Sequence, residues 1–343
     1  MASVPNSNAQ EGTPDAQVDN TGVPIEADDE SDHDSAFGDG EASSTTSISS
    51  SILKYREENG RTYHAYKELK YVLPNDEHEL DRLDLQHHLF LLTQQGKLFL
   101  CPIPKEQQLH RVLDVGTGTG IWAIDFADEH PETQVLGIDL SPTQPSMVPP
   151  NLNFQIDDLE DEWVFSQKFD FIYSRMLVGS FANWPRFFEQ AYENLTPGGW
   201  MEVTDICFPA RSDDNSWPPG SALKEWSRLM IESAAVLGRF SNSAASYKEQ
   251  MEKVGFENVT EIQNKWPTRG WPKDPKMKEL GMWNKENMLG ALHGISVALF
   301  TRGLGWSNEE LEVFLAGVRK EWVDPKVHVY FPIYTVYAQK PKV

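Results

Sequence analysis

The chain has 343 residues, with 52 Asp and Glu against 30 Lys and Arg, a formal net charge of −22 and 39% hydrophobic residues. Nucleic-acid binding is driven by Lys and Arg that displace counterions from phosphates, so this balance excludes DNA and RNA as expected partners. Two cysteines, Cys101 and Cys207, exclude a disulfide framework, and no apolar run approaches the ~20 residues that cross a bilayer. We therefore expect a cytoplasmic protein without membrane contact.

Residues 1–53 differ in composition from the rest of the chain. They hold eleven Asp or Glu, no Lys or Arg and one aromatic residue, Phe37, and they include a Ser/Thr run from Ser43 to Ser51. Such a segment has too little apolar surface to offset the entropy of ordering, so we predict a disordered acidic tail. It is either a solubilising extension or a phosphorylated, partner-binding segment, and any protein partners are expected here.

A helix and then a sheet are predicted next. From Asn75 a capping residue, acidic residues in the first turn and apolar positions such as Leu83 and Phe90 predict a helix, which makes 54–110 an N-terminal helical cap. Short apolar runs follow at 112–115, 135–139, 151–156, 169–174 and 200–205. Stretches long enough for crossover helices separate them, so we predict an α/β domain over 111–343 with a parallel sheet covered on both faces.

The C-terminal half predicts helical additions and a closing strand. Residues Ser221–Leu237 carry apolar side chains at helical spacing, and Ser307 with Glu310 forms a capping box before another helix. The final segment, His328–Lys340, is rich in β-branched and aromatic residues. Pro332 within it predicts an edge strand or a break, because proline cannot donate to a ladder.

A glycine-rich turn follows the first apolar strand: Asp114-Val-Gly116-Thr-Gly118-Thr-Gly120. Glycines allow a sharp turn and close approach of a ligand to the backbone, which indicates a nucleotide-type ligand. The dinucleotide pattern G-x-G-x-x-G is not met, since Ile121 stands where its third glycine would be, and no G-K-S/T follows to cradle a triphosphate.

Acidic residues at the ends of successive strands complete the pattern. Asp114 stands where a carboxylate can order the turn and reach a cationic ligand group indirectly. Asp139 ends the second strand, where its two carboxylate oxygens can accept hydrogen bonds from both hydroxyls of a ribose. Asp157 and Asp158 follow the third strand and offer a carboxylate to an adenine amino group; of the two we favour Asp158. Arg175 follows the fourth strand at the ligand-binding edge of the sheet, where a ligand or an ordinary ion pair would engage it.

At these residues the sequence resembles class I S-adenosylmethionine (SAM)-dependent methyltransferases, from about Val112 to Asp205. The segments YHAYKELKYVLPNDEHELDRLDLQHH, VLDVGTGTGIWAIDFA, GIDLSPTQP and FDFIYSRM, with the Pro-Gly-Gly turn at 197–199, are similar to the LaeA-like methyltransferases of fungal secondary metabolism. The resemblance implies a Rossmann-like sheet with helical additions and SAM as cofactor. It also implies that Gly116, Gly118 and Gly120 carry the methionine end, Asp139 the ribose and Asp158 the adenine.

Histidines, tyrosines and tryptophans outside these motifs have structural as well as functional interpretations. His87 shares an apolar helical face and is expected to be a hydrogen-bonded core histidine. His293 and His328 have no carboxylate or cysteine neighbours at metal-ligand spacing, so no metal site is predicted. By the resemblance, Tyr63 and Tyr66 hold positions that close over the cofactor. Tryptophans concentrate between residues 200 and 322 and either fill the core or form the wall of an acceptor pocket, with three candidates for that wall: Trp266, Trp271 and Trp283.

Two functions from different classes follow. In the first, the protein is a biosynthetic SAM-dependent methyltransferase acting on oxygen or nitrogen of a small, aromatic or heterocyclic secondary metabolite. In the second, it is a nuclear regulator that keeps the SAM fold and acts through protein partners. The absence of a basic import cluster favours the enzyme. No catalytic base is identified from the sequence, and motifs for methylating nucleic-acid bases are absent.

Overall fold

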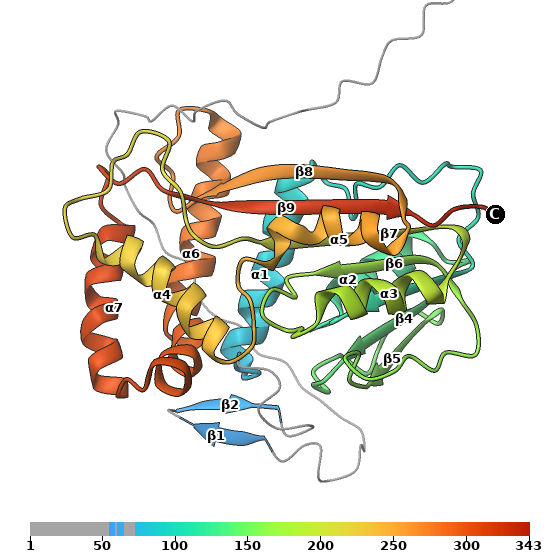
Figure 1. Cartoon of the computed structure of the whole chain (residues 1–343), viewed down its shortest axis with the longest axis horizontal. Coiled ribbons are helices and arrows are strands. Elements are labelled where there is room, and N and C mark those ends of the chain that lie inside the picture. Colours follow the sequence, from blue (N-terminus) through green and yellow to red (C-terminus); the bar gives the residue numbers. More distant parts are fainter. Residues whose placement is uncertain (1–54, 59, 65–72) are drawn as a thin grey trace, which may run out of the picture.

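The computed structural model describes residues 55–58, 60–64 and 73–343, so the predicted tail over 1–53 and Tyr66 lie outside the described residues. Figure 1 shows a sheet with helices packed along it and a second group of helices beyond one end of the strands. Within the described residues, no helix is long and apolar enough to pass through a membrane.

A seven-stranded sheet forms the centre, in the order β5-β4-β3-β6-β7-β9-β8. Five of its strands are parallel: β3 (Arg111–Val115), β4 (Gln134–Asp139), β5 (Leu152–Ile156), β6 (Phe169–Arg175) and β7 (Leu195–Ile206). Two more run antiparallel to their neighbours in the order given: β9 (Tyr330–Gln339) and β8 (Glu257–Pro267). The predicted α/β class is confirmed, and the five strands predicted to be parallel are parallel, within a sheet that is mixed as a whole.

Three details of the sheet differ from prediction. Pro332 does not mark an edge, because β9 lies between β7 and β8. The Pro332 carbonyl accepts from the Cys207 N–H at 2.9 Å, and without an N–H the proline cannot return the bond, so the β7–β9 ladder ends there. The Pro-Gly-Gly segment is part of β7, where the pairing with β6 is interrupted by a register shift. Strand β8 was not predicted.

Helices cover both faces of the sheet. Helix α2 (Ile121–Glu129) packs on one face, in a cluster that includes Val112 and Phe171. Helices α3 (Trp184–Asn194) and α5 (Tyr247–Val254) pack on the other face, in a cluster that includes Leu113 and Ile172. Neighbouring residues of one strand thus belong to different clusters, because successive side chains of a strand point to opposite faces.

The segment before the sheet contains more than the predicted helix. A hairpin of β1 (Arg56–Glu58) and β2 (Arg61–Tyr63) precedes α1 (Glu77–Thr93). Asp76, not Asn75, caps α1 by accepting from the Glu79 N–H, and Phe90 is buried as predicted. The division of the chain at residues 53 and 110 stays a prediction.

A third cluster joins the additional helices to the ends of β7, β8 and β9. It contains α4 (Ala222–Val236), α6 (Pro275–Ala298), α7 (Asn308–Trp322) and a π-helical turn, η2 (Leu299–Gly303). A short 3-10 turn, η1 (Ser243–Ser246), belongs through Ala244 to the cluster of α3 and α5. The capping box of Ser307 and Glu310 is present. Helix α1 packs against α6, which places this helical group beside the N-terminal helix.

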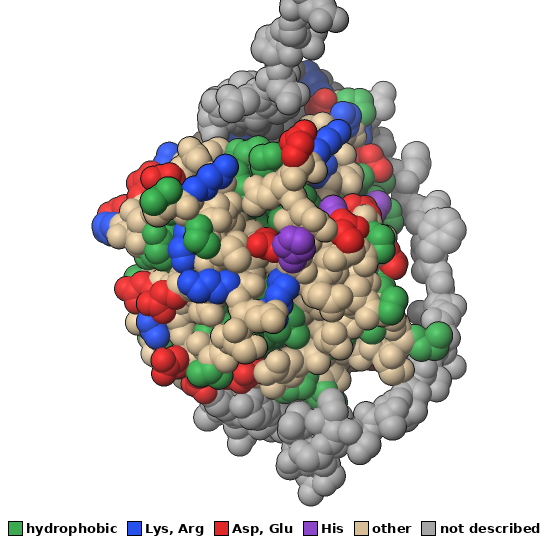
Figure 2. Space-filling view, turned by 90° about the vertical axis from the view of Figure 1, so that its right-hand side faces the viewer, with side chains coloured by type: hydrophobic (Ala, Val, Ile, Leu, Met, Phe, Trp, Pro, Cys, Tyr) green, Lys and Arg blue, Asp and Glu red, His purple; other side chains and the backbone are tan. Residues whose placement is uncertain are grey.

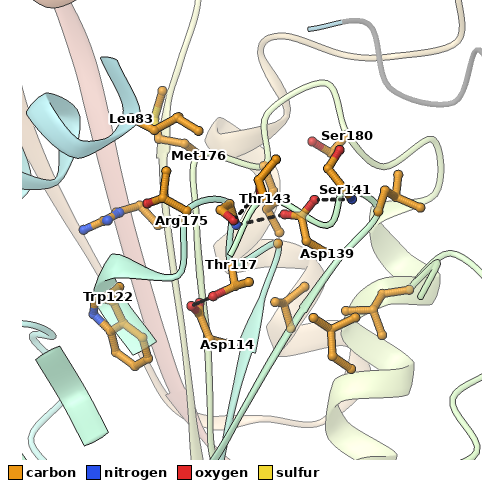
Figure 3. A pocket seen from close by; sticks show the side chains of 18 of the residues that line it. Leu83, Asp114, Thr117, Trp122, Asp139, Ser141, Thr143, Arg175, Met176 and Ser180 are labelled. Atoms are coloured by element: carbon orange, nitrogen blue, oxygen red, sulfur yellow. Dashed lines mark hydrogen bonds between the residues drawn. The ribbon is translucent and has the colours of Figure 1, made fainter. Parts of the chain in front are cut away.

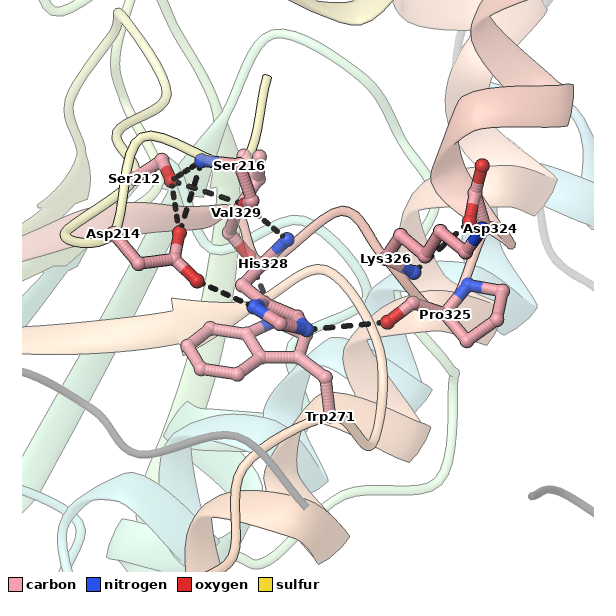
Figure 4. A network of polar contacts seen from close by, with 9 residues as sticks. All are labelled: Ser212, Asp214, Ser216, Trp271, Asp324, Pro325, Lys326, His328 and Val329. Atoms are coloured by element: carbon pink, nitrogen blue, oxygen red, sulfur yellow. Dashed lines mark hydrogen bonds and ion pairs between the residues drawn. The ribbon is translucent and has the colours of Figure 1, made fainter. Parts of the chain in front are cut away.

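Two loops near α7 and β9 are joined by the polar network of Figure 4. His328 Nδ1 lies 2.5 Å from an oxygen of Asp214 and its Nε2 lies 3.1 Å from the Pro325 carbonyl. Trp271 stacks beside this imidazole and donates to the Val329 carbonyl at 3.1 Å. The hydrogen bonds with His328 and Ser212 hold the pKa of Asp214 down at about 2, against its burial. These groups are therefore occupied in joining loops.

Candidate functional site

A pocket opens at the carboxyl ends of β3, β4 and β6, beneath α1 (Figure 3). The space inside it, counted together with the open solvent at its entrance, is about 1220 Å³. The lining contains most of the residues predicted from the sequence: Asp114, Gly116, Gly118, Asp139, Asp158 and Arg175. Gly120 is not among the lining residues.

The glycine turn is held by backbone contacts with β4. The N–H groups of Gly116 and Thr117 donate to the Ile138 carbonyl at 2.8 and 3.0 Å. The Gly118 carbonyl accepts from the Thr143 hydroxyl at 2.8 Å and from the Gln144 amide at 2.7 Å. The turn is thus fixed on both sides before any ligand arrives.

The three glycines have different surroundings. All have a positive φ, which L side chains rarely adopt. A Cβ on Gly120 would lie 2.4 Å from Phe154, so this glycine makes room for packing of the turn on β5. A Cβ on Gly118 would meet only Leu83, at 3.5 Å, because that side faces the pocket. Gly118 therefore offers the open backbone that a ligand can approach.

Asp114 lies buried at the end of β3. Its carboxylate accepts from the Thr117 hydroxyl at 2.6 Å, which ties the strand end to the turn. Burial raises the pKa of Asp114 to about 6, while Thr117 and the positive charge of Arg175 act in the opposite direction. The carboxylate is thus an ordering group that also places negative potential under the turn.

Asp139 accepts from two backbone groups on either side of the pocket floor. One oxygen accepts from the Gly118 N–H and the other from the Ser141 N–H, both at 2.9 Å. Burial raises its pKa, and these two hydrogen bonds counter the rise. A carboxylate has about four lone-pair sites, so acceptor capacity for two hydroxyls of a ligand remains.

Asp158 follows β5 and is buried at the same pocket. One of its oxygens accepts from the Glu160 N–H at 2.9 Å, while its own N–H donates to Asp157 at 2.8 Å. The apolar side chains of Leu159 and Phe181 line the pocket with it. This end of the pocket combines a buried carboxylate with apolar surface, which suits a heterocyclic base with an exocyclic amino group.

Arg175 ends β6 and lines the pocket together with Met176. His87, buried on α1, contacts both Arg175 and Asp125, so the expected hydrogen-bonded core histidine is found there. Tyr63 ends β2 and is buried, but it is not among the residues that line the pocket.

The predicted tryptophan wall is wrong. Trp266 is fully buried in β8, where its indole N–H donates to the Thr93 hydroxyl at 2.8 Å. Trp271 is buried beside His328, and Trp283 lies on α6 with 39% of its surface exposed. None of the three lines the pocket, and β8 extends through Trp266 and carries its side chain into the helical group.

Apolar side chains from α1 and the turn after β6 line the pocket instead: Leu80, Leu83, Met176 and Leu177. The sequence placed two of these on the helical face predicted for α1, but that periodicity does not distinguish a core from a ligand pocket. Thr117, Ser141, Thr143 and Gln144 were also missed, although they lie inside the two motifs that carried the resemblance.

Three buried polar atoms in the lining have no hydrogen-bond partner among the described residues. They are the amide nitrogen of Asn75, just before α1, the hydroxyl of Tyr173, on β6, and the hydroxyl of Ser180, after β6. Buried polar groups are rarely left unpaired, so these atoms indicate that the pocket is completed by a polar ligand. No group of three or more His, Cys, Asp or Glu in the described part of the chain is arranged to hold a metal ion.

Comparisons with known proteins agree with this geometry. A family model described as a methyltransferase domain matches residues 85–261. The chain is 39% identical over 300 residues to the methyltransferase pytC of Aspergillus terreus, covering 87% of this chain and 92% of that protein. It is 33% identical over 320 residues to the secondary metabolism regulator laeA of Aspergillus fumisynnematus, covering 90% and 85%.

Among solved structures, the chain is similar to phosphoethanolamine N-methyltransferase 2 of Haemonchus contortus, in complex with phosphomonomethylethanolamine and S-adenosylhomocysteine. The TM-score is 0.43 at 18% identity, over 76% of this chain and 52% of that one.

Proposed function

Because this chain belongs to the class I SAM-dependent methyltransferases, we propose that it methylates an oxygen or nitrogen of a small-molecule secondary metabolite. The observation that carries this proposal is the pocket at the strand ends. It joins a nucleoside-binding pattern of acids and an open glycine turn to an apolar mouth under α1. One cofactor and one small acceptor therefore share a single hollow.

The described residues fit SAM. Gly118 leaves its pocket side open. The amide nitrogen of Asn75 and the hydroxyl of Ser180 can form hydrogen bonds with polar groups of the cofactor. We assign the ribose hydroxyls to Asp139 and the adenine amino group to Asp158, and the methionine end to the backbone of Gly116 and Gly118. Gly120 is proposed to support the turn through its packing on β5.

When bound, SAM supplies a methyl group already activated on a sulfonium, so the chain needs no strong nucleophile. Its residues hold the acceptor in line and exclude water, which is the role we give to Leu80, Leu83 and Met176 at the mouth. Asp114 and Asp139 add the negative potential that a cationic cofactor favours. No side chain is assigned as a general base.

Charge and shape support a small acceptor, aromatic or heterocyclic, over a polyanion. The chain carries a net charge of −22, and the face in Figure 2 shows Lys and Arg interspersed with Asp and Glu. A polyanion is bound by clustered positive charge. The described residues on the face in Figure 2 form no such cluster of Lys and Arg. Apolar side chains at the mouth instead suit a ligand that can be desolvated.

The proposal is tested with purified protein, trideuteromethyl-labelled SAM and a metabolite extract from the source, analysed by mass spectrometry. We expect a labelled small molecule in the wild-type reaction and none with Asp139→Ala, which retains most of the surrounding pocket. Label that appears only in protein, or in nothing at all with a cofactor-binding enzyme, would overturn the small-molecule assignment.

A second candidate is a regulator that acts through protein partners, favoured by the similarity to the relative named secondary metabolism regulator laeA. The same labelled SAM added to a protein extract tests it: labelled protein without labelled metabolite supports this alternative. The tail over 1–53, where partners were predicted to bind, lies outside the described residues.

A further inference from the structure

Arg175 is held in one orientation by groups from two helices. Its guanidinium nitrogen Nη2 lies 3.0 Å from His87 Nδ1, and its Cζ lies 4.6 Å from the centre of the Phe90 ring, both on α1. The other imidazole nitrogen, Nε2, lies 2.9 Å from a carboxylate oxygen of Asp125 on α2. Asp125, His87 and Arg175 therefore form a chain of hydrogen bonds that ends in the pocket.

The chemistry of these groups determines where the histidine proton lies. A guanidinium only donates and an ionised carboxylate only accepts, so Nδ1 must accept from Arg175 and Nε2–H must donate to Asp125. His87 is thus neutral, in the Nε2–H tautomer. Burial and the neighbouring charge of Arg175 lower the pKa of His87 to about 3, in agreement with that state. The carboxylate of Asp125 selects the tautomer whose free nitrogen faces Arg175.

We propose that Asp125 and His87 are positioning residues that aim Arg175 at the carboxylate of the bound SAM. The inference rests on the proposed function, because it requires SAM in this pocket. It assigns roles to two residues, His87 and Asp125, that do not line the pocket.

The expected orientation of bound SAM places its carboxylate near Arg175. Asp139 and Asp158 stand at the nucleoside end, and Figure 3 shows Arg175 on the opposite side of the Asp114–Thr117 pair from Asp139. An extended ligand whose ribose meets Asp139 therefore places its amino-acid end toward Arg175.

The charges of the lining lead to the same conclusion. The carboxylates of Glu79 and Glu160 also line the pocket, but they are paired with Arg82 and Arg239. Among the described lining residues, Arg175 is the only Lys or Arg. A ligand carboxylate that enters this pocket has one cation to meet, and a planar guanidinium matches a carboxylate geometrically.

Calorimetry with two ligands separates this role from a general structural one. S-adenosylhomocysteine carries the carboxylate, whereas 5′-methylthioadenosine has the same thioether nucleoside without an amino acid. For Arg175→Met we expect S-adenosylhomocysteine to bind roughly 10- to 100-fold more weakly, since a hydrogen bond to a charged group is lost. The affinity for 5′-methylthioadenosine should stay unchanged.

Variants of the two positioning residues give graded effects. Asp125→Ala should weaken S-adenosylhomocysteine several-fold without affecting 5′-methylthioadenosine, because the imidazole can then turn its N–H toward Arg175. Asp128→Ala, an exposed acid on the same helix, is the matched control and should change neither affinity. His87→Asn keeps an acceptor for Arg175 and should retain more S-adenosylhomocysteine binding than His87→Leu. Nitrogen NMR of labelled histidine should show the Nε2–H tautomer in the wild type and its loss in Asp125→Ala.

Three results would overturn the inference. Equal weakening of both ligands by Arg175→Met and Asp125→Ala would show a structural role alone. Unchanged S-adenosylhomocysteine binding with an impaired KM for the acceptor would assign Arg175 to an acidic acceptor. A wild-type protein that binds neither ligand would refute the proposed function together with this inference. In the first two results the wild-type protein still binds both ligands, so those results refute the inference alone.

Discussion

Replacement of Asp139 by alanine is the sharpest perturbation of the proposed cofactor site. The carboxylate accepts from the N–H groups of Gly118 and Ser141, both at 2.9 Å, and we assign its remaining acceptor capacity to the ribose. Hydrogen bonds to a charged group contribute about 1.5–3 kcal/mol each, and the cost of burying the carboxylate, seen in its raised pKa, offsets part of this. We expect Asp139→Ala to lower the free energy of unfolding by about 2–4 kcal/mol.

Asp139→Ala should also weaken ligand binding, in addition to its effect on stability. Two ribose hydroxyls would lose a charged acceptor, which we expect to weaken S-adenosylhomocysteine by about 2 kcal/mol or more, or roughly 30-fold. Calorimetry measures the affinity and thermal unfolding measures the stability, with Asp128→Ala as an exposed-acid control. An Asp139→Ala protein that folds and binds with wild-type affinity would show that the acid at the end of β4 does not hold the ribose.

Three further predictions concern other parts of the molecule. Gly118→Val should abolish measurable S-adenosylhomocysteine binding, because a branched side chain at φ +59° would strain the turn and enter the pocket; wild-type affinity in a folded variant would refute the open-turn argument. Burial raises the pKa of Glu202 from 4.5 to about 7, so the folded protein keeps a proton that the unfolded chain releases, and stability should fall as pH rises from about 4.5 through 7. Glu202→Gln should flatten this fall and stabilise the protein by on the order of 3 kcal/mol at pH 8, and an unchanged profile of Tm against pH would contradict it. Trp283→Ala should keep full turnover, since this side chain lies on α6 away from the pocket; a large fall in kcat would return it to the acceptor site.

The sequence alone determined the centre of the fold and most of the acids and glycines that meet at the pocket. Local signals suffice there: apolar runs of strand length, a glycine turn, and acids at the strand ends. Since parallel strands bring their carboxyl ends to one edge, Asp114, Asp139 and Asp158 meet at one pocket although they are far apart in the chain. The resemblance then supplied the cofactor, which the geometry of the turn fits.

Elements that lack a simple pattern could not be read in this way. Strand β8 is the edge strand of the sheet, and much of it is half-buried with polar side chains among apolar ones, so it carries no clear alternation. Because β8 was not predicted, Trp266 was a candidate for an acceptor wall, although core packing was the other alternative. Pro332 predicted an edge strand or a break, but β9 continues through it inside the sheet, and only the ladder with β7 ends there.

The acceptor side and the orientation of Arg175 were decided by tertiary structure alone. His87 contacts Asp125, 38 residues away, and Arg175, 88 residues away, on three different elements. Which of these groups donates, and toward which cavity the guanidinium points, depends on how α1 and α2 pack over the end of β6. Periodicity identified His87 as a buried residue of α1, but side-chain polarity along one helix contains no information about the partners that a second helix and a strand bring to it.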